Sequence, residues 1–262
     1  MDVQEGALKH GLPYLAVGEG RPLVFLRGLH PVHANAEGFQ RKMELKGVAG
    51  LARHYRVHLV GRGPGLAEGA TMADIATQHA EALADRFTGP VDVLGVSSGG
   101  SVALQLAADH PEVVRRLVVA ASGCTLGPDA KRAQLAWADA YEKGRRGLHH
   151  SAAIASTSPV VRALMRPLMW AMDPLMRPAD PTDMIRFIRA EDGFDVGDRL
   201  AGINIPTLVI GGDRDAAYPV EIFRRTATGI PGGALIVYPR TGHVGSFTHK
   251  SFASDVQGFL SM

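Results

Sequence analysis

Short runs of apolar and β-branched residues recur along the chain at intervals that suit a parallel sheet. Each run is nearly continuous in hydrophobic residues, which is typical of strands that are buried on both faces. Six runs predict strands, at 22–28, 55–61, 91–97, 114–122, 205–212 and 234–240. The pattern at 7–17 predicts a short antiparallel hairpin before them.

Segments with apolar residues at helical spacing alternate with most of these runs. The segment 71–87 begins with Thr71 and Asp74, a pair typical of a capping box. Further helices are predicted at 98–110 and 251–260. Strands that alternate with helices predict an α/β fold with a doubly wound, mostly parallel sheet.

One connection is much longer than an ordinary α/β loop and contains no convincing strand, from 129 to 200. Three pairs in it are each typical of an N-cap followed by proline at the first helical position: Ser158-Pro159, Asp173-Pro174 and Asp180-Pro181. They predict several short helices that meet at sharp corners, the last ending near Gly193. We therefore expect a helical cap at 129–200, inserted in a core domain made of 1–128 and 201–262.

Composition narrows the class of protein. Hydrophobic residues make up 46% of the chain and the net charge is +2, which is ordinary for a soluble globular protein. The basic residues are scattered in pairs without interleaved aromatic residues, so no nucleic-acid partner is expected. The single cysteine, Cys124, excludes an internal disulfide and favours a reducing compartment. No signal peptide or run long enough to span a membrane is visible, which predicts a cytoplasmic protein.

The stretch Gly95-Val96-Ser97-Ser98-Gly99 carries the clearest chemical signal. It fits G-x-S-x-G where a predicted strand turns into a predicted helix, which is the setting of a nucleophile elbow. A serine nucleophile needs a base, and the base needs an orienting acid. An aspartate at 213 or 215 and His243 each follow a later strand, so the order Ser…Asp…His is available.

With these motifs the whole chain resembles the α/β-hydrolase superfamily, of the small bacterial serine esterase type with a helical cap. The matching stretches are GVSSGG, the acid loop GGDRDAAYP, the histidine loop TGH and the glycine-rich loop GRGPG. The resemblance implies a triad of Ser97, Asp215 and His243, and Asp213 is then expected to form a turn. It also implies an oxyanion hole made by the backbone N–H groups of Leu29 and Ser98.

One residue departs from the family pattern. Where the family usually has His-Gly-x after the first long strand, this chain has Arg27-Gly28-Leu29. Since the expected donor is a backbone group, the change need not remove the oxyanion hole. We expect Arg27 to form a buried or half-buried ion pair, and a contact with the substrate is the alternative.

The expected substrate pocket involves His30 and the cap. Met165, Met169, Met172 and Met176 are spaced to share one helical face, with Trp170 among them. Pro167 and Pro174 predict a kink there rather than a straight helix. Some methionines are expected to pack the cap onto the core, and at least one of Met169, Trp170 and Met172 is expected to line the pocket. No metal-ligand spacing occurs, so neither a metal nor a cofactor is expected.

The predicted function is hydrolysis of a small, apolar carboxylic ester through an acyl-enzyme. A carbon–carbon bond hydrolase, lactonase, thioesterase or perhydrolase on the same triad remains an alternative. A small-molecule receptor with little turnover is the alternative from another class. The expected partner is a small-molecule substrate, and the sequence leaves the oligomeric state open.

Overall fold

Eight strands form one mixed, mostly parallel sheet in the computed structural model, which describes residues 2–262. The strands are β1 (Val3–Ala7), β2 (Pro13–Val17), β3 (Pro22–Leu26), β4 (Arg56–Val60), β5 (Val91–Val96), β6 (Val114–Ala120), β7 (Thr207–Gly212) and β8 (Ala234–Tyr238), in the spatial order β1-β2-β4-β3-β5-β6-β7-β8. The hairpin β1–β2 is antiparallel and joins the sheet by antiparallel pairing of β2 with β4. The other pairings are parallel. The predicted six strands and doubly wound sheet are confirmed, and so is the hairpin, although its first strand ends at Ala7, where the predicted segment begins.

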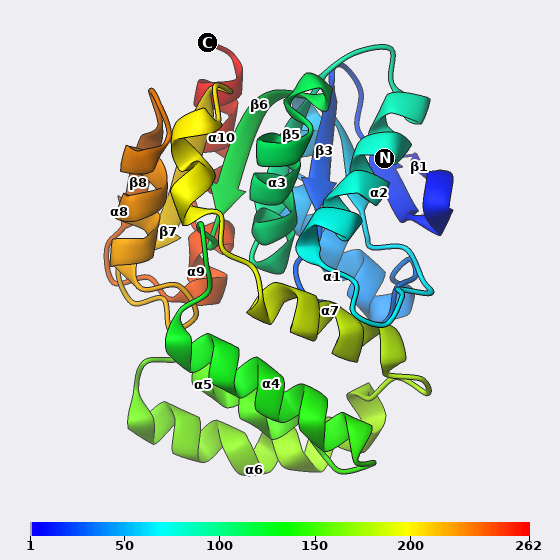
Figure 1. Ribbon diagram of the computed structural model, residues 1–262, viewed down its shortest axis with the longest axis vertical. Helices are drawn as coiled ribbons and strands as arrows, with labels where there is room; N and C mark the ends of the chain where they lie inside the picture. The colour runs from blue at the N-terminus through cyan, green and yellow to red at the C-terminus, as the bar shows by residue number, and fades with distance from the viewer. Residues whose placement is uncertain (1) are drawn as a thin grey trace.

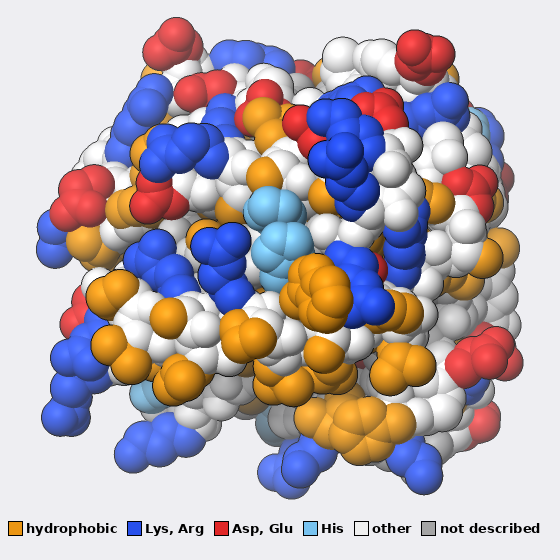
Figure 2. All heavy atoms as spheres, turned by 90° about the horizontal axis from the view of Figure 1, so that it is seen from below, with side chains coloured by type: hydrophobic (Ala, Val, Ile, Leu, Met, Phe, Trp, Pro, Cys, Tyr) orange, Lys and Arg blue, Asp and Glu red, His pale blue; other side chains and the backbone are white. Residues whose placement is uncertain are grey.

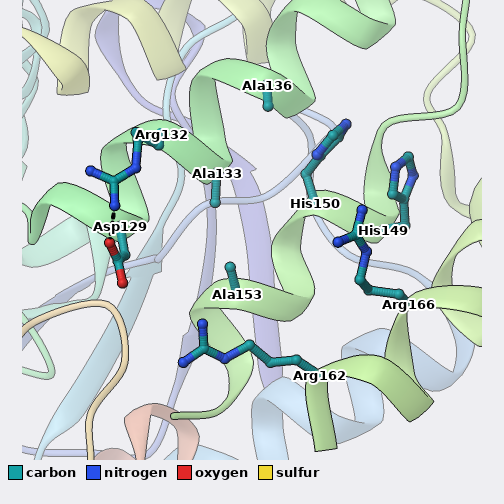
Figure 3. A pocket seen from close by; sticks show the side chains of 9 residues that line it. All are labelled: Asp129, Arg132, Ala133, Ala136, His149, His150, Ala153, Arg162 and Arg166. Atoms are coloured by element: carbon teal, nitrogen blue, oxygen red, sulfur yellow. Dashed lines mark hydrogen bonds and ion pairs between the residues drawn. The ribbon is translucent and has the colours of Figure 1, made fainter. Parts of the chain in front are cut away.

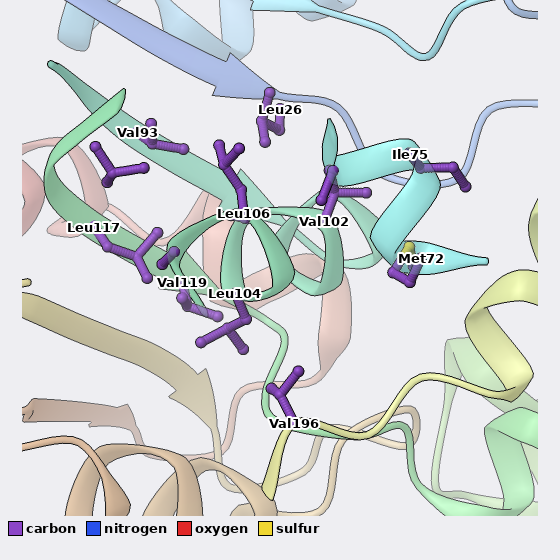
Figure 4. Packing of buried hydrophobic residues seen from close by; sticks show 14 of the residues in the cluster. Leu26, Met72, Ile75, Val93, Val102, Leu104, Leu106, Leu117, Val119 and Val196 are labelled. Atoms are coloured by element: carbon purple, nitrogen blue, oxygen red, sulfur yellow. The ribbon is translucent and has the colours of Figure 1, made fainter. Parts of the chain in front are cut away.

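Helices cover both faces of this sheet. Val93 of β5 packs on the face covered by α2 (Met72–Arg86), α3 (Ser98–Asp109) and α8 (Val220–Gly229), whereas its neighbour Leu94 packs on the face covered by α1 (Gly38–Val48) and α10 (Phe252–Leu260). Figure 4 shows α3 with Val102, Leu104 and Leu106 in the first of these cores. Because alternate residues of one strand are buried on opposite faces, the strand sequences are continuously apolar.

The segment between β6 and β7 is helical. It contains α4 (Pro128–Glu142), α5 (Ala152–Ala155), α6 (Pro159–Met176) and α7 (Thr182–Asp192). In Figure 1, β3 and β6 point toward these helices, and α7 lies between the sheet and the other three. The last helix ends beside Gly193, as predicted. Within residues 2–262, no helix combines the length and hydrophobicity needed to cross a membrane.

The remaining helices are short or lie in the connections. The α-helix α9 (His243–Thr248) follows β8, and 3-10 turns occur at η1 (Lys9–Gly11), η2 (Leu51–Arg53), η3 (Pro111–Val113), η4 (Leu148–Ser151) and η5 (Gly197–Gly202). The capping box of Thr71 and Asp74 at the start of α2 is formed in both directions.

The prediction of separate short helices around Pro167 and Pro174 is wrong, because the single helix α6 continues through both prolines. Ser158 caps α6 as expected, but Asp173 lies inside the helix and is buried. Its carboxylate accepts hydrogen bonds from the backbone N–H groups of Gly147 (2.8 Å) and Leu148 (2.7 Å), so it caps η4 instead of its own helix. These bonds hold the last turns of α6 in place although proline lacks the N–H of a regular helix.

The third predicted cap is displaced by one residue. The helix α7 begins at Thr182 rather than at Pro181, and the Asp180 carboxylate accepts a hydrogen bond from the N–H of Thr182 (2.9 Å).

Candidate active site

Ser97 lies at the sharp turn between β5 and α3, with φ 54° and ψ −128°. A residue other than glycine is strained at these backbone angles, as expected for a nucleophile elbow. The turn is possible because Gly95 and Gly99, two residues away on either side, lack side chains. A Cβ at Gly95 would lie 2.4 Å from the carbonyl oxygen of Gly99, and one at Gly99 would lie 2.1 Å from the carbonyl oxygen of Leu26.

The structure brings Ser97, His243 and Asp215 into one hydrogen-bonded chain. The Oγ of Ser97 lies 2.9 Å from Nε2 of His243, and Nδ1 of His243 lies 2.9 Å from Oδ2 of Asp215. The Asp215 carboxylate also accepts hydrogen bonds from the backbone N–H groups of Ala217 (2.8 Å) and Tyr218 (3.0 Å), and its side chain is fully buried. With the Nδ1–H tautomer, this arrangement leaves Nε2 free to accept the Ser97 proton.

Asp213 occupies a different position from Asp215. Its carboxylate accepts a hydrogen bond from the N–H of Thr241 (3.1 Å) on the exposed side of the loop. Hydrogen bonds from the backbone, chiefly that of Arg240, lower the pKa of Asp213. The structure therefore places Asp215, and not Asp213, against His243.

The loop after β3 lies against the nucleophile. A Cβ at Gly28 would come within 3.3 Å of the Ser97 Cβ, so the adjoining Leu29 peptide lies close to the elbow. Arg27, which replaces the usual family histidine, is buried and forms an ion pair with Glu44 (3.1 Å). Burial is the main cause that lowers the pKa of Arg27, and the charge of Glu44 opposes it.

Arg62 holds the loop after β3 in place, and the sequence analysis did not identify it as a residue of the site. Its guanidinium donates hydrogen bonds to the carbonyl oxygens of Gly28 (3.0 Å) and His30 (3.2 Å), on either side of Leu29. Burial lowers the pKa of Arg62 to about 10. The available signal was a single arginine inside the otherwise small-residue loop GRGPG.

Glu191 of α7 is a second contributor that sequence reasoning did not find. Its carboxylate is fully buried and accepts hydrogen bonds from the hydroxyls of Ser98 (2.8 Å) and Ser101 (2.9 Å) at the start of α3. Burial raises its pKa, whereas the two serine bonds and the charge of Arg62 lower it. The inserted helices are thereby tied to the residue that follows Ser97 in the chain.

A cavity of about 490 Å³ opens beside Ser97 and His243. Its walls are mostly apolar and come from the β3–α1 region and from α9, with Leu29, Met43, Val48, Val96, Val244 and Phe247 among the lining residues. His30 lines it as expected. Among the described residues, no group of three His, Cys, Asp or Glu side chains is placed to hold a metal ion.

The structure does not place Met169, Trp170 or Met172 in the wall of this cavity. Met169 packs against the buried cluster around Trp137 of α4. Trp170 and Met172 are 51% and 40% exposed on the outer side of α6. Cys124 is buried, and burial raises its pKa.

Comparison with known proteins gives matches over most of the chain. A family model described as "Alpha/beta hydrolase family" matches residues 23–255. A 2-hydroxy-6-oxononadienedioate/2-hydroxy-6-oxononatrienedioate hydrolase of Cupriavidus pinatubonensis is 26% identical over 91% of this chain and 86% of its own length. A pimeloyl-[acyl-carrier protein] methyl ester esterase of Neisseria meningitidis is 28% identical over 71% of this chain and 75% of its own.

A solved structure agrees with the fold. An alpha/beta hydrolase enzyme from a Medee basin deep-sea metagenome library superposes with a TM-score of 0.77, at 22% identity, over 96% of this chain and 95% of the other. At this identity the likeness establishes the fold alone.

Proposed function

Because the chain belongs to the alpha/beta hydrolase family, we propose that it is a serine carboxylesterase that acts through an acyl-enzyme. The observation that carries the proposal is the continuous hydrogen-bonded chain from the Ser97 hydroxyl through His243 to the buried Asp215. Each member has the partner that its role requires.

The proposed reaction begins when Ser97 Oγ attacks the ester carbonyl carbon and its proton passes to Nε2 of His243. The N–H groups of Leu29 and Ser98 stabilise the oxyanion of the tetrahedral intermediate. His243 then gives the proton to the leaving alcohol, and the acyl group remains on Ser97. Water, deprotonated by His243, attacks the acyl-enzyme by the same route and releases the carboxylic acid.

The cavity supports an uncharged, apolar substrate. Arg27 is the only Arg or Lys among the described residues that line it, and Glu44 balances its charge. A substrate carboxylate would have to compete with Glu44 for that guanidinium. A serine nucleophile also argues against displacement at saturated carbon, for which the family uses a carboxylate. Cleavage of a carbon–carbon bond, lactone or thioester, or perhydrolysis, on the same residues remains the alternative chemistry.

The test of this proposal is hydrolysis of p-nitrophenyl esters of graded chain length by wild-type protein and by Ser97→Ala. We expect the variant to lose about 10³-fold or more in kcat, because the triad acts as a unit. A folded Ser97→Ala protein that kept more than a tenth of the wild-type rate would refute the proposal.

The substrate class is tested with a matched pair of methionines. Met43→Ala, in the cavity wall, is expected to raise KM for long-chain esters several-fold, since each buried methylene contributes about 0.8 kcal/mol. Met172→Ala, exposed on α6, is expected to leave KM unchanged. The reverse result would place the acyl group against the inserted helices.

A further inference from the structure

A second hollow, of about 360 Å³, lies within the inserted segment and shares no lining residue with the cavity beside Ser97. It is open to solvent and is lined by residues of α4, η4, α5 and α6 (Figure 3). Its ionisable lining residues are one acid and five basic side chains: Asp129, Arg132, His149, His150, Arg162 and Arg166. The triad uses none of them.

The charges in this hollow do not cancel. Asp129 is paired with Arg132, which leaves Arg162 and Arg166 and a net charge of +2 while the histidines are neutral. The rings of His149 and His150 lie with their centroids 4.1 Å apart. The positive charge of Arg166 disfavours protonation of both rings.

Both histidines have lowered pKa values, and the positive charge of the hollow contributes to this. Burial is the main cause that lowers the pKa of His149, followed by the charge of Arg166, while Asp173 opposes both. The pKa of His150 is lowered by burial, by His149 and by Arg166. A bound anion would favour the protonated form of both rings and would therefore raise both pKa values.

Two polar atoms of the hollow also lack partners. The Nε of Arg162 and the Nδ1 of His149 are buried and have no hydrogen-bond partner among residues 2–262. A buried polar group without a hydrogen-bond partner is unfavourable, so these two groups call for an explanation. Both atoms are almost inaccessible, so a ligand in the hollow reaches them only if the Arg162 and His149 side chains turn toward it.

We propose that this hollow binds the phosphate group of an organic phosphate monoester. A phosphomonoester carries close to two negative charges at neutral pH, which matches the net charge of the hollow. Guanidinium groups such as those of Arg162 and Arg166 suit phosphate oxygens in number and geometry. The volume is within the range of small-molecule sites and leaves room for part of the organic group.

The position of the site fits a diffusible ligand. Figure 2 views the molecule from the side of the inserted helices and shows histidine side chains near the centre of this face, with basic side chains beside them. The phosphate can belong to a part of the ester substrate that lies outside the apolar cavity or to a separate ligand, since both present the same chemistry to these side chains.

The binding test uses inorganic phosphate and phenyl phosphate as probes in isothermal titration calorimetry at pH 7.5. We expect saturable binding of phenyl phosphate to wild-type protein, and at least tenfold weaker binding to Arg162→Gln/Arg166→Gln. The control Arg53→Gln/Lys250→Gln removes two exposed positive charges elsewhere and is expected to bind within twofold of wild type. Failure of the wild type to bind either probe at millimolar concentration, or wild-type affinity in the Arg162/Arg166 variant, would overturn the proposal.

Two further measurements keep the result independent of folding and of the esterase proposal. The single variant Arg166→Gln changes an exposed side chain and serves if the double variant melts early. Ser97→Ala is expected to bind phenyl phosphate as wild type does, whether or not Ser97 is a nucleophile. Saturating phosphate is also expected to raise the pKa of His149 and His150 in NMR titrations, and unchanged values would contradict binding here.

A kinetic comparison identifies the source of the phosphate. If it belongs to the substrate, Arg162→Gln/Arg166→Gln raises KM for an ester that carries a phosphate and not for its neutral analogue. If it belongs to a separate ligand, neither KM changes while phenyl phosphate binding is still lost. Both results support the site.

Discussion

The buried carboxylate of Glu191 leads to a quantitative prediction about the junction between α7 and the elbow. Glu191→Ala removes two hydrogen bonds to a charged acceptor, which contribute about 1.5–3 kcal/mol each. It also deprives the fully buried Arg62 of a counter-charge. We expect the free energy of unfolding to fall by roughly 4 kcal/mol, and Tm by about 10 °C at 2–4 °C per kcal/mol.

Two control variants test whether the destabilisation by Glu191→Ala comes from its buried hydrogen bonds and charge. Glu191→Gln keeps the shape and one acceptor oxygen but also removes the charge that faces Arg62, so an intermediate loss of roughly 2 kcal/mol is expected. Glu142→Ala breaks an exposed ion pair with Arg189 and is expected to cost about 1 kcal/mol or less.

The assay is thermal melting of all three variants, followed by ester hydrolysis at a temperature where each is folded. Because Ser98 donates its hydroxyl to Glu191 and its N–H is the proposed oxyanion donor, we expect Glu191→Ala to lower kcat more than tenfold. If Glu191→Ala melts within 2 °C of wild type, on the order of 1 kcal/mol by the same conversion, the buried network does not hold α7 to the elbow and the reasoning fails.

Two other predictions concern the acid of the triad and stability at low pH. Asp215→Asn is expected to lower kcat by about 10⁴-fold through the wrong tautomer of His243, and Asp213→Asn by less than about tenfold; a larger loss in Asp213→Asn would reverse the assignment. Burial is the main cause that lowers the pKa of His33, His58 and His79 from 6.5 to about 4. As the pH falls, the unfolded state therefore takes up these protons before the folded state does. The stability that is present above pH 6.5 is lost as the pH drops toward 4. By pH 5.5 the loss is about 4 kcal/mol for the three together, partly offset by the raised pKa of Glu191. Denaturant midpoints at pH 7.5 and 5.5 check this, with His58→Phe expected to remove about a third of the loss; an equal loss in that variant would contradict it.

The parts of the site that could be predicted from the sequence are those that local patterns encode. Ser97 was identified because the glycines that its strained turn requires lie within a few residues of it. His243 was identified because it follows a strand, and the acid loop motif selected Asp215 over Asp213. Strands were predictable for a similar reason, since burial on both faces makes them continuously apolar.

The parts that could not be predicted depend on contacts between distant segments. Glu191 reaches Ser98 across 93 positions of the chain, and nothing near it in sequence marks it as buried. The course of α6 was mispredicted because local rules end a helix at Pro167 or Pro174, whereas Asp173 makes its hydrogen bonds to η4. The inserted helices were expected to supply the pocket wall, but α1 and α9 flank Ser97 more closely.

The most direct test of the proposed nucleophile is covalent labelling with a fluorophosphonate, read out by intact mass and peptide mapping. We expect one adduct per chain, located on Ser97, much slower labelling in His243→Ala because the base is lost, and no adduct in Ser97→Ala. Wild-type protein that remains unlabelled, or that carries its adduct on another residue, would contradict the assignment of Ser97 as an activated nucleophile.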